Sequence, residues 1–205
     1  ISIASGRSVS LQGLTIENHR GRADVQVDGT ARIVGCTLGP GDDVGLEAAS
    51  GSVVDVERTR VTGNAVGGVT VAGGYTIGNV VVDHNGTGVD LGAAPGTFAF
   101  DTVVANGGDA THAGVQCGAA ATAIASSIVL GNAPAPGAQV SASCDAATSM
   151  TTGNAGFDAD GFHLGRRSPL IDGADCAAAP LGALDFDGDA RPIGVRCEIG
   201  ADERP

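Results

Sequence analysis

The sequence has 205 residues, of which 42% are hydrophobic, and its 23 acidic residues against 11 basic ones give a formal net charge of −12. Every basic residue is an arginine, which excludes lysine-dependent chemistry, and the acidic balance argues against nucleic acid and anionic lipid as partners. The composition of 34 glycines, no tryptophan and one tyrosine indicates a thin, repetitive core, and no apolar run approaches the roughly 18 residues of a transmembrane helix.

In chain order, the first feature is a repeat with a period near 22 residues. One apolar residue per repeat sets the register, and it recurs at intervals of 21 to 25 residues. A constant period with a few residues of slack is typical of a solenoid, in which each repeat forms one turn of a coil. The register positions are Ile16, Leu38, Val61, Val82, Val104 and Val129.

Each repeat contains three short runs in which apolar and variable residues alternate, as in strands with one buried face. The first run carries the register position, and the second and third begin near Val25 and Ile33 in the first complete repeat. We predict an all-β fold, a single-stranded right-handed parallel β-helix with three short strands per rung and about 22 residues per rung. Residues 1–144 would form the rungs of an N-terminally truncated β-helix, and residues 145–205 the last rung and a C-terminal cap.

Asparagines form a second ladder, two or three residues after the register position. Asparagine tolerates a left-handed backbone, and its amide can hydrogen-bond to the next rung, so we assign these residues a structural role at one turn. They are Asn64, Asn85, Asn106 and Asn132.

Four of the five cysteines fall in the second half of the chain. We predict a disulfide between Cys176 and Cys197, which flank an acidic loop, and a second one between Cys117 and Cys144, at nearly equivalent places on successive rungs. Cys36 lies at an inward position and is expected to be a small core residue. Two disulfides favour an oxidising compartment, so we expect an extracellular or cell-envelope protein.

After Cys144 the period fails, and the chain ends in a segment that would cap the last rung. This segment resembles the C-terminal end of bacterial right-handed β-helix repeat proteins of the choice-of-anchor Q type, which are fold relatives of pectate lyases. The resemblance implies an extracellular or envelope-associated protein and carries no catalytic residues across. It rests on Phe162 to Leu164, Ser168 to Asp172, Asp185 to Asp189, Arg191-Pro192 and Ile199 to Glu203.

Asp185, Asp187 and Asp189 alternate within the acidic loop of this segment. Three carboxylates around a glycine can wrap a hard cation, so calcium is the one cofactor that the sequence suggests. The rest of a calcium-loop pattern is absent, and an acidic turn paired with Arg191 is the alternative interpretation.

The outward face of the first sheet, formed by the runs with the register positions, is where fold relatives with lyase activity hold calcium and an arginine base. Its charged residues Glu17, Arg60 and Asp83 span four rungs, too far apart for an obvious carboxylate cluster, so we assign no catalytic residue. An apolar strip on this face predicts contact with a loop, a cap or a partner. The strip consists of Val81, Val103, Ile128 and Leu130.

The histidines lack metal-ligand spacing, and His84, beside Asp83, is interpreted as an exposed turn residue. The four histidines are His19, His84, His112 and His163. The leading hypothesis is a secreted or cell-surface β-helix module, monomeric, that serves as a spacer, an adhesin-like rod or a surface for polysaccharide or another surface protein. The alternative is a carbohydrate-active enzyme, a pectate-lyase-like polysaccharide lyase or a glycan hydrolase, with its site on the first sheet.

Overall fold

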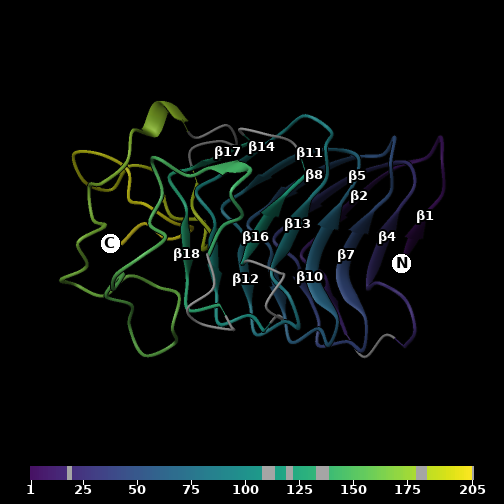
Figure 1. Cartoon of the computed structure of the whole chain (residues 1–205), viewed down its shortest axis with the longest axis horizontal. Helices are drawn as coiled ribbons and strands as arrows, with labels where there is room; N and C mark the ends of the chain where they lie inside the picture. The colour runs from purple at the N-terminus through teal and green to yellow at the C-terminus, as the bar shows by residue number, and fades with distance from the viewer. Residues whose placement is uncertain (18–19, 108–113, 119–121, 133–138, 179–183, 205) are drawn as a thin grey trace.

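The computed structural model describes residues 1–17, 20–107, 114–118, 122–132, 139–178 and 184–204. These residues form a parallel β-solenoid of about six turns, spaced about 22 residues apart, and the two ends of the chain lie at opposite ends of the coil (Figure 1). The prediction of an all-β parallel β-helix is confirmed. His19 and His112 lie outside the described residues.

Three parallel sheets run along the coil, named here by their first strands. The β1 sheet contains β1 (Ser2–Ile3), β4 (Val25–Val27), β7 (Val44–Ala48), β10 (Gly67–Val71), β13 (Val89–Leu91) and β16 (Val115–Cys117). The β2 sheet contains β2 (Ser8–Gln12), β5 (Thr30–Val34), β8 (Val53–Glu57), β11 (Gly74–Gly78), β14 (Gly96–Ala99), β17 (Thr122–Ala125) and β19 (Cys144–Asp145). The β3 sheet contains β3 (Thr15–Ile16), β6 (Thr37–Leu38), β9 (Arg60–Thr62), β12 (Val81–Asp83), β15 (Thr102–Val104) and β18 (Ile128–Leu130).

The core is a stack of apolar rows, because each strand pairs with its equivalent one turn away and places like side chains above one another. In the β2 sheet one such row runs Ile33, Val56, Ile77, Phe98 and Ile124, and every member is buried. Cys36 belongs to the same core, as its inward position predicted.

The β3 sheet, expected as the first sheet, departs from the predicted register in one turn. Val103, not Val104, pairs with Val82 and with Val129 and packs in the core. Val103 therefore does not belong to an outward strip, and Val104 takes the outward position. The run Thr102-Val103-Val104 offers two adjacent valines, and alternation alone does not decide which of them is buried.

The asparagine ladder is confirmed. The side-chain Oδ1 of Asn85 accepts hydrogen bonds from the backbone N and from Nδ2 of Asn64, each 3.0 Å long. Asn106 accepts from Asn85 in the same way, and Asn132 from Asn106. All four asparagines are buried. On each of these turns the backbone N–H of the asparagine, which would otherwise be unpaired, donates to the asparagine side chain of the next turn.

A further polar ladder, which the sequence did not reveal, lies at the turn between the β2 and β3 sheets. The backbone N of Val80 donates to Asp101 Oδ1 at 2.9 Å, and that of Asp101 to Ser127 Oγ at 3.1 Å. The backbone N of Ser127 in turn donates to Ser149 Oγ. Aspartate and serine thus accept hydrogen bonds from buried backbone N–H groups at this turn, as asparagine does at the turn between the β3 and β1 sheets.

The coil continues past β18 through isolated parallel bridges from Val140 to Val115 and from Met150 to Ile128. Beyond these, residues 154–204, called here the C-terminal segment, run mainly as turns, with a short 3-10 helix at Cys176–Ala178. In the described part of this segment no regular strand adds to the three sheets.

The C-terminal segment covers the outward face of the β3 sheet, so the apolar strip, which was expected to contact a loop, a cap or a partner, lies against the cap. Val81 and Ile128 are 1% and 0% exposed, and with Leu130 they pack in one cluster with residues of the segment. The glycine at position 200 lies directly on Ile128. A strip that the chain itself covers is not an interface, because its apolar surface is already removed from water. The covering residues are Ala155, Phe157, Phe162, Leu164, Leu170, Phe186, Ile199 and Ala201.

Candidate functional site

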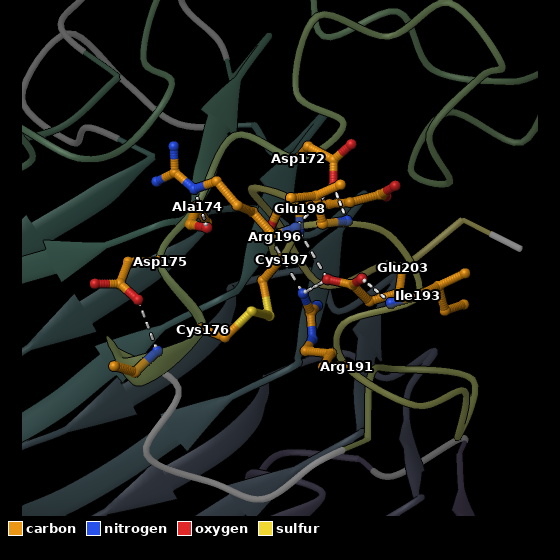
Figure 2. The surroundings of a disulfide bond; sticks show 12 residues. Asp172, Ala174, Asp175, Cys176, Arg191, Ile193, Arg196, Cys197, Glu198 and Glu203 are labelled. Carbon is orange, nitrogen blue, oxygen red and sulfur yellow. Dashed lines mark hydrogen bonds and ion pairs between the residues drawn. A yellow bond between two sulfur atoms is a disulfide. The ribbon is translucent and has the colours of Figure 1, made fainter.

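One buried arginine is among the contacts between the C-terminal segment and the coil. Arg191 Nη1 donates to Glu203 Oε1 at 2.6 Å, and both side chains are at most 1% exposed. Its Nε donates to Asn79 Oδ1 at 3.0 Å, and its guanidinium lies 4.7 Å from the centre of the Phe100 ring. Since Asn79 and Phe100 belong to the coil and Glu203 to the end of the chain, a single side chain bridges the two. Figure 2 shows the contact of Arg191 with Glu203.

Two disulfides reinforce the second half of the chain, in the pairing predicted. Cys117 is bonded to Cys144 across neighbouring turns, and Cys176 to Cys197 within the C-terminal segment. Figure 2 shows the latter bond beside the Arg191 and Glu203 pair. A cross-link and a buried ion pair thus restrain the same part of the segment.

The charged groups on the outward face of the β3 sheet satisfy one another. Arg60 holds Asp83 through two hydrogen bonds, Nε to Oδ1 at 2.9 Å and Nη2 to Oδ2 at 2.6 Å, and His84 Nδ1 lies 2.7 Å from the same Oδ2. Burial favours a raised pKa for Asp83, but the hydrogen bonds from Arg60 and His84 lower it below its usual value. The Arg60 guanidinium also stacks on the Phe162 ring, with 4.7 Å to its centre, whereas Glu17 is exposed elsewhere.

In the acidic turn at residues 185–189, one carboxylate is buried and accepts backbone hydrogen bonds, and the other two line a pocket. Asp185 is fully buried, and it accepts three backbone hydrogen bonds, two from the turn itself and one from Glu203 N at 2.7 Å. Asp187 and Asp189 instead line a neighbouring pocket. The calcium site at Asp185, Asp187 and Asp189 stays a prediction, and Arg191, the alternative partner for these carboxylates, makes its ion pair with Glu203.

That pocket is centred on His163 and has a volume of about 330 Å³. His163 Nδ1 is hydrogen-bonded to Asp160 Oδ2, and Nε2 lies 2.7 Å from Asp187 Oδ2. Asp202, only 7% exposed, accepts a hydrogen bond from the backbone N of Leu164 at 2.7 Å. One ligand-type atom from each of His163, Asp187 and Asp202 lies within 4.8 Å of the other two.

The pKa values of Asp202 and His163 are shifted by burial and by the charged groups close to them. Burial raises the pKa of Asp202, and the negative charges of Asp185 and Asp187 raise it further. Burial lowers the pKa of His163, but the hydrogen bonds to Asp160 and Asp187 outweigh it and raise that pKa above its usual value. Sequence reasoning missed this pocket because its acidic side chains come from separate turns of the C-terminal segment, with no local spacing to reveal them.

Comparison with known proteins finds no matching family model, no matching curated protein and no matching solved structure. The resemblance of the C-terminal segment to choice-of-anchor Q proteins is therefore a hypothesis that rests on its own residues. Among the described residues, no helix has the length and apolar character needed to cross a membrane.

Proposed function

We propose that this chain is an extracellular β-helix module whose role is structural, as a rigid spacer or adhesin-like unit of a secreted or surface protein. The observation that carries the proposal is the cover over the β3 sheet, where the apolar face that could have met a partner or substrate is packed against the C-terminal segment. Arg191, which Glu203 holds within the cover, attaches it to the coil through its hydrogen bond to Asn79 and its packing on Phe100. We further propose membership of the choice-of-anchor Q type β-helix proteins.

The disulfides support the extracellular part of this proposal. Each would stabilise the fold by about 3 kcal/mol through the entropy of the unfolded chain, and such bonds persist in oxidising compartments. The chain's remaining cysteine, Cys36, is buried in the core and takes no part in them.

The alternative function, a polysaccharide lyase on the β3 sheet, would need an arginine able to accept a proton. Arg60 is the arginine on that face, and its hydrogen bonds with Asp83 raise its pKa. A raised pKa makes the guanidinium a weaker acid and its neutral form rarer, so Arg60 as placed here is poorly suited to act as a base.

The proposal is tested with the protein purified from the cells that make it. We expect the intact chain in the extracellular or envelope fraction, with one free thiol per chain when it is unfolded without reductant. We also expect no release of unsaturated oligosaccharides from acidic polysaccharides with calcium present. Depolymerisation that is lost in Arg60→Gln but kept in the surface variant Arg32→Gln would overturn the structural function, and a reduced intracellular protein would overturn the location.

A further inference from the structure

The pocket around His163 brings three potential metal-ligand atoms together. His163 Nε2 faces Asp187 Oδ2 at 2.7 Å, and one ligand-type atom from each of His163, Asp187 and Asp202 lies within 4.8 Å of the other two. Imidazole nitrogen and carboxylate oxygen are common ligands of Zn²⁺ and related first-row ions.

The two sides of the imidazole cannot both be satisfied by the neutral ring. A neutral histidine carries one N–H, yet Nδ1 and Nε2 each face a carboxylate oxygen, from Asp160 and Asp187 respectively. If Nδ1 keeps its hydrogen for Asp160, the lone pair of Nε2 points at a second acceptor. A proton between Nε2 and the Asp187 oxygen, or a metal ion in its place, would then satisfy both atoms.

The position of Asp160 is the one that a metal-bound histidine requires. Histidine ligands usually donate their other ring N–H to a carboxylate, which fixes the tautomer and the orientation of the ring. Asp160 is held in turn, since its Oδ1 accepts hydrogen bonds from the backbone N of Phe162 and of His163 at 3.2 and 3.1 Å. The ring is therefore oriented before any ion arrives, with Nε2 toward Asp187.

The pocket also carries an excess of negative charge that a divalent cation would neutralise. Its lining contains five carboxylates, and the only arginine among the described lining residues, Arg204, is held by Asp158 at 3.0 Å. Asp202 is nine-tenths buried, so its charge is poorly solvated by water. The five carboxylates belong to Asp158, Asp160, Asp187, Asp189 and Asp202.

We propose that His163 Nε2, Asp187 and Asp202 bind a divalent first-row transition-metal ion, for which Zn²⁺ is the probe. Zinc bonds of about 2.0–2.2 Å put the donors of a tetrahedral site roughly 3.4 Å apart, so binding requires Nε2 and Asp187 Oδ2, which are 2.7 Å apart, to separate slightly. The nitrogen ligand distinguishes this site from the all-oxygen calcium site considered for Asp185, Asp187 and Asp189, because calcium prefers oxygen.

The test is calorimetric titration of the full chain, freed of metal by a chelator, with ZnCl₂ and separately with CaCl₂. We expect saturable binding of one Zn²⁺ per chain and a higher melting temperature with Zn²⁺ than without it. His163→Gln and Asp187→Asn should remove saturable binding at concentrations that fill the wild type. Asp160→Asn, which removes only the group that orients the ring, should weaken binding by about 10- to 100-fold.

The matched control is His84→Gln, which removes the other described histidine that contacts an aspartate but lies outside the pocket. It should bind Zn²⁺ as the wild type does. Folding of each variant is checked by far-ultraviolet circular dichroism. If His163→Gln does not fold, Asp187→Asn decides, because the side chain of Asp187 is 44% exposed. Absence of saturable Zn²⁺ binding, or equal binding by His163→Gln or by the Asp187→Asn variant, overturns the site, as does Ca²⁺ binding in preference to Zn²⁺.

Discussion

Arg191 and Glu203 form an ion pair from which water is almost wholly excluded, with 2.6 Å between Nη1 and Oε1 and side chains 1% and 0% exposed. Glu203 also accepts hydrogen bonds from the backbone N of Ile193 and of Glu198, at 3.1 and 2.8 Å. Arg191 donates to the carbonyls of Glu198 and Gly200. The pair is thus the centre of a satisfied polar network that fixes the path of the last turns.

Replacing one member of this pair should destabilise the protein strongly. In Glu203→Gln the Arg191 charge stays buried without its counter-charge, and breaking such a pair costs about 3–5 kcal/mol. Denaturant unfolding of the variant and the wild type measures the difference. Arg32→Gln, which removes a surface arginine 53% exposed and paired with Asp55 and Glu57, is the control, with a cost below about 1 kcal/mol. Equal losses in the two variants would contradict the role assigned to burial.

The asparagine ladder should show a similar dependence on burial. Asn85→Ala leaves the backbone N of Asn64 without its side-chain partner and removes one hydrogen bond from the carbonyl of Val61. An unsatisfied buried group costs about 1–3 kcal/mol and a lost hydrogen bond about 0.5–1.5 kcal/mol, so the expected loss in the free energy of unfolding is about 1.5–4.5 kcal/mol. Asn154→Ala, at an exposed turn where the side chain accepts a hydrogen bond from the nearby Gly156 N, should lose less than about 1 kcal/mol. If the ladder had no structural role, the two variants would lose similar amounts of free energy of unfolding.

The coil could be predicted because its physical cause repeats along the chain. Every turn must fill the same inward positions, so a period near 22 residues identifies the rungs, and the asparagines that pair successive turns recur with it. The prediction was wrong by one residue at Val103 and Val104, where two adjacent valines fit either face. The rest of the outward strip was predicted, but a loop, a cap and a partner all fitted it equally well from sequence. The structure shows that the C-terminal segment packs on Val81 and Ile128.

The His163 pocket lay beyond sequence reasoning because no repeat generates it. Asp160 lies three residues before His163, but Asp187 and Asp202 reach the ring only through the folded path of the segment. The disulfide between Cys117 and Cys144 could be predicted, since neighbouring turns bring Cys144 within two residues of the position that pairs with Cys117. Tertiary contacts between non-periodic turns carry no such signal.

Stability should fall as the pH rises through about 7, because of Glu198. This side chain is 4% exposed, and burial raises its pKa to about 7, with the charges of Glu203 and Asp202 adding to the rise and Arg191 opposing it. The folded state therefore binds this proton more tightly than the unfolded chain, whose glutamate pKa is about 4.3. Between these two values the free energy of unfolding should decrease with rising pH, by an amount on the order of 3 kcal/mol.

Glu198→Gln isolates this contribution. Denaturant unfolding at several pH values should show a flatter dependence between about pH 5 and pH 8 in the variant than in the wild type. The comparison is needed because His163, whose pKa is raised by its aspartate neighbours although burial opposes the rise, contributes with the same sign. Identical slopes for the two proteins would show that Glu198 does not titrate in this range.

Asp101 should be a site where a neutral side chain improves the fold. Its carboxyl is 0% exposed, Oδ1 accepts from Val80 N at 2.9 Å, and Oδ2 has no hydrogen-bond partner among the described residues. Burial raises the pKa of Asp101 well above its usual value. Because the folded state favours the protonated acid, the carboxylate lowers stability as the pH rises through that raised pKa.

Asp101→Asn keeps an oxygen for Val80 and cannot ionise. We expect its free energy of unfolding to exceed that of the wild type by about 1 kcal/mol or more at high pH, with a smaller difference at about pH 5. Asp90→Asn, on the exposed face of β13, is the control and should change stability by less than about 0.5 kcal/mol. Denaturant titrations of the three proteins at both pH values measure these differences. The variant keeps the hydrogen bond from Val80 N and replaces only Oδ2, by an NH2 group. If Asp101→Asn is less stable than the wild type at high pH, the buried carboxylate must receive a stabilising contact at Oδ2.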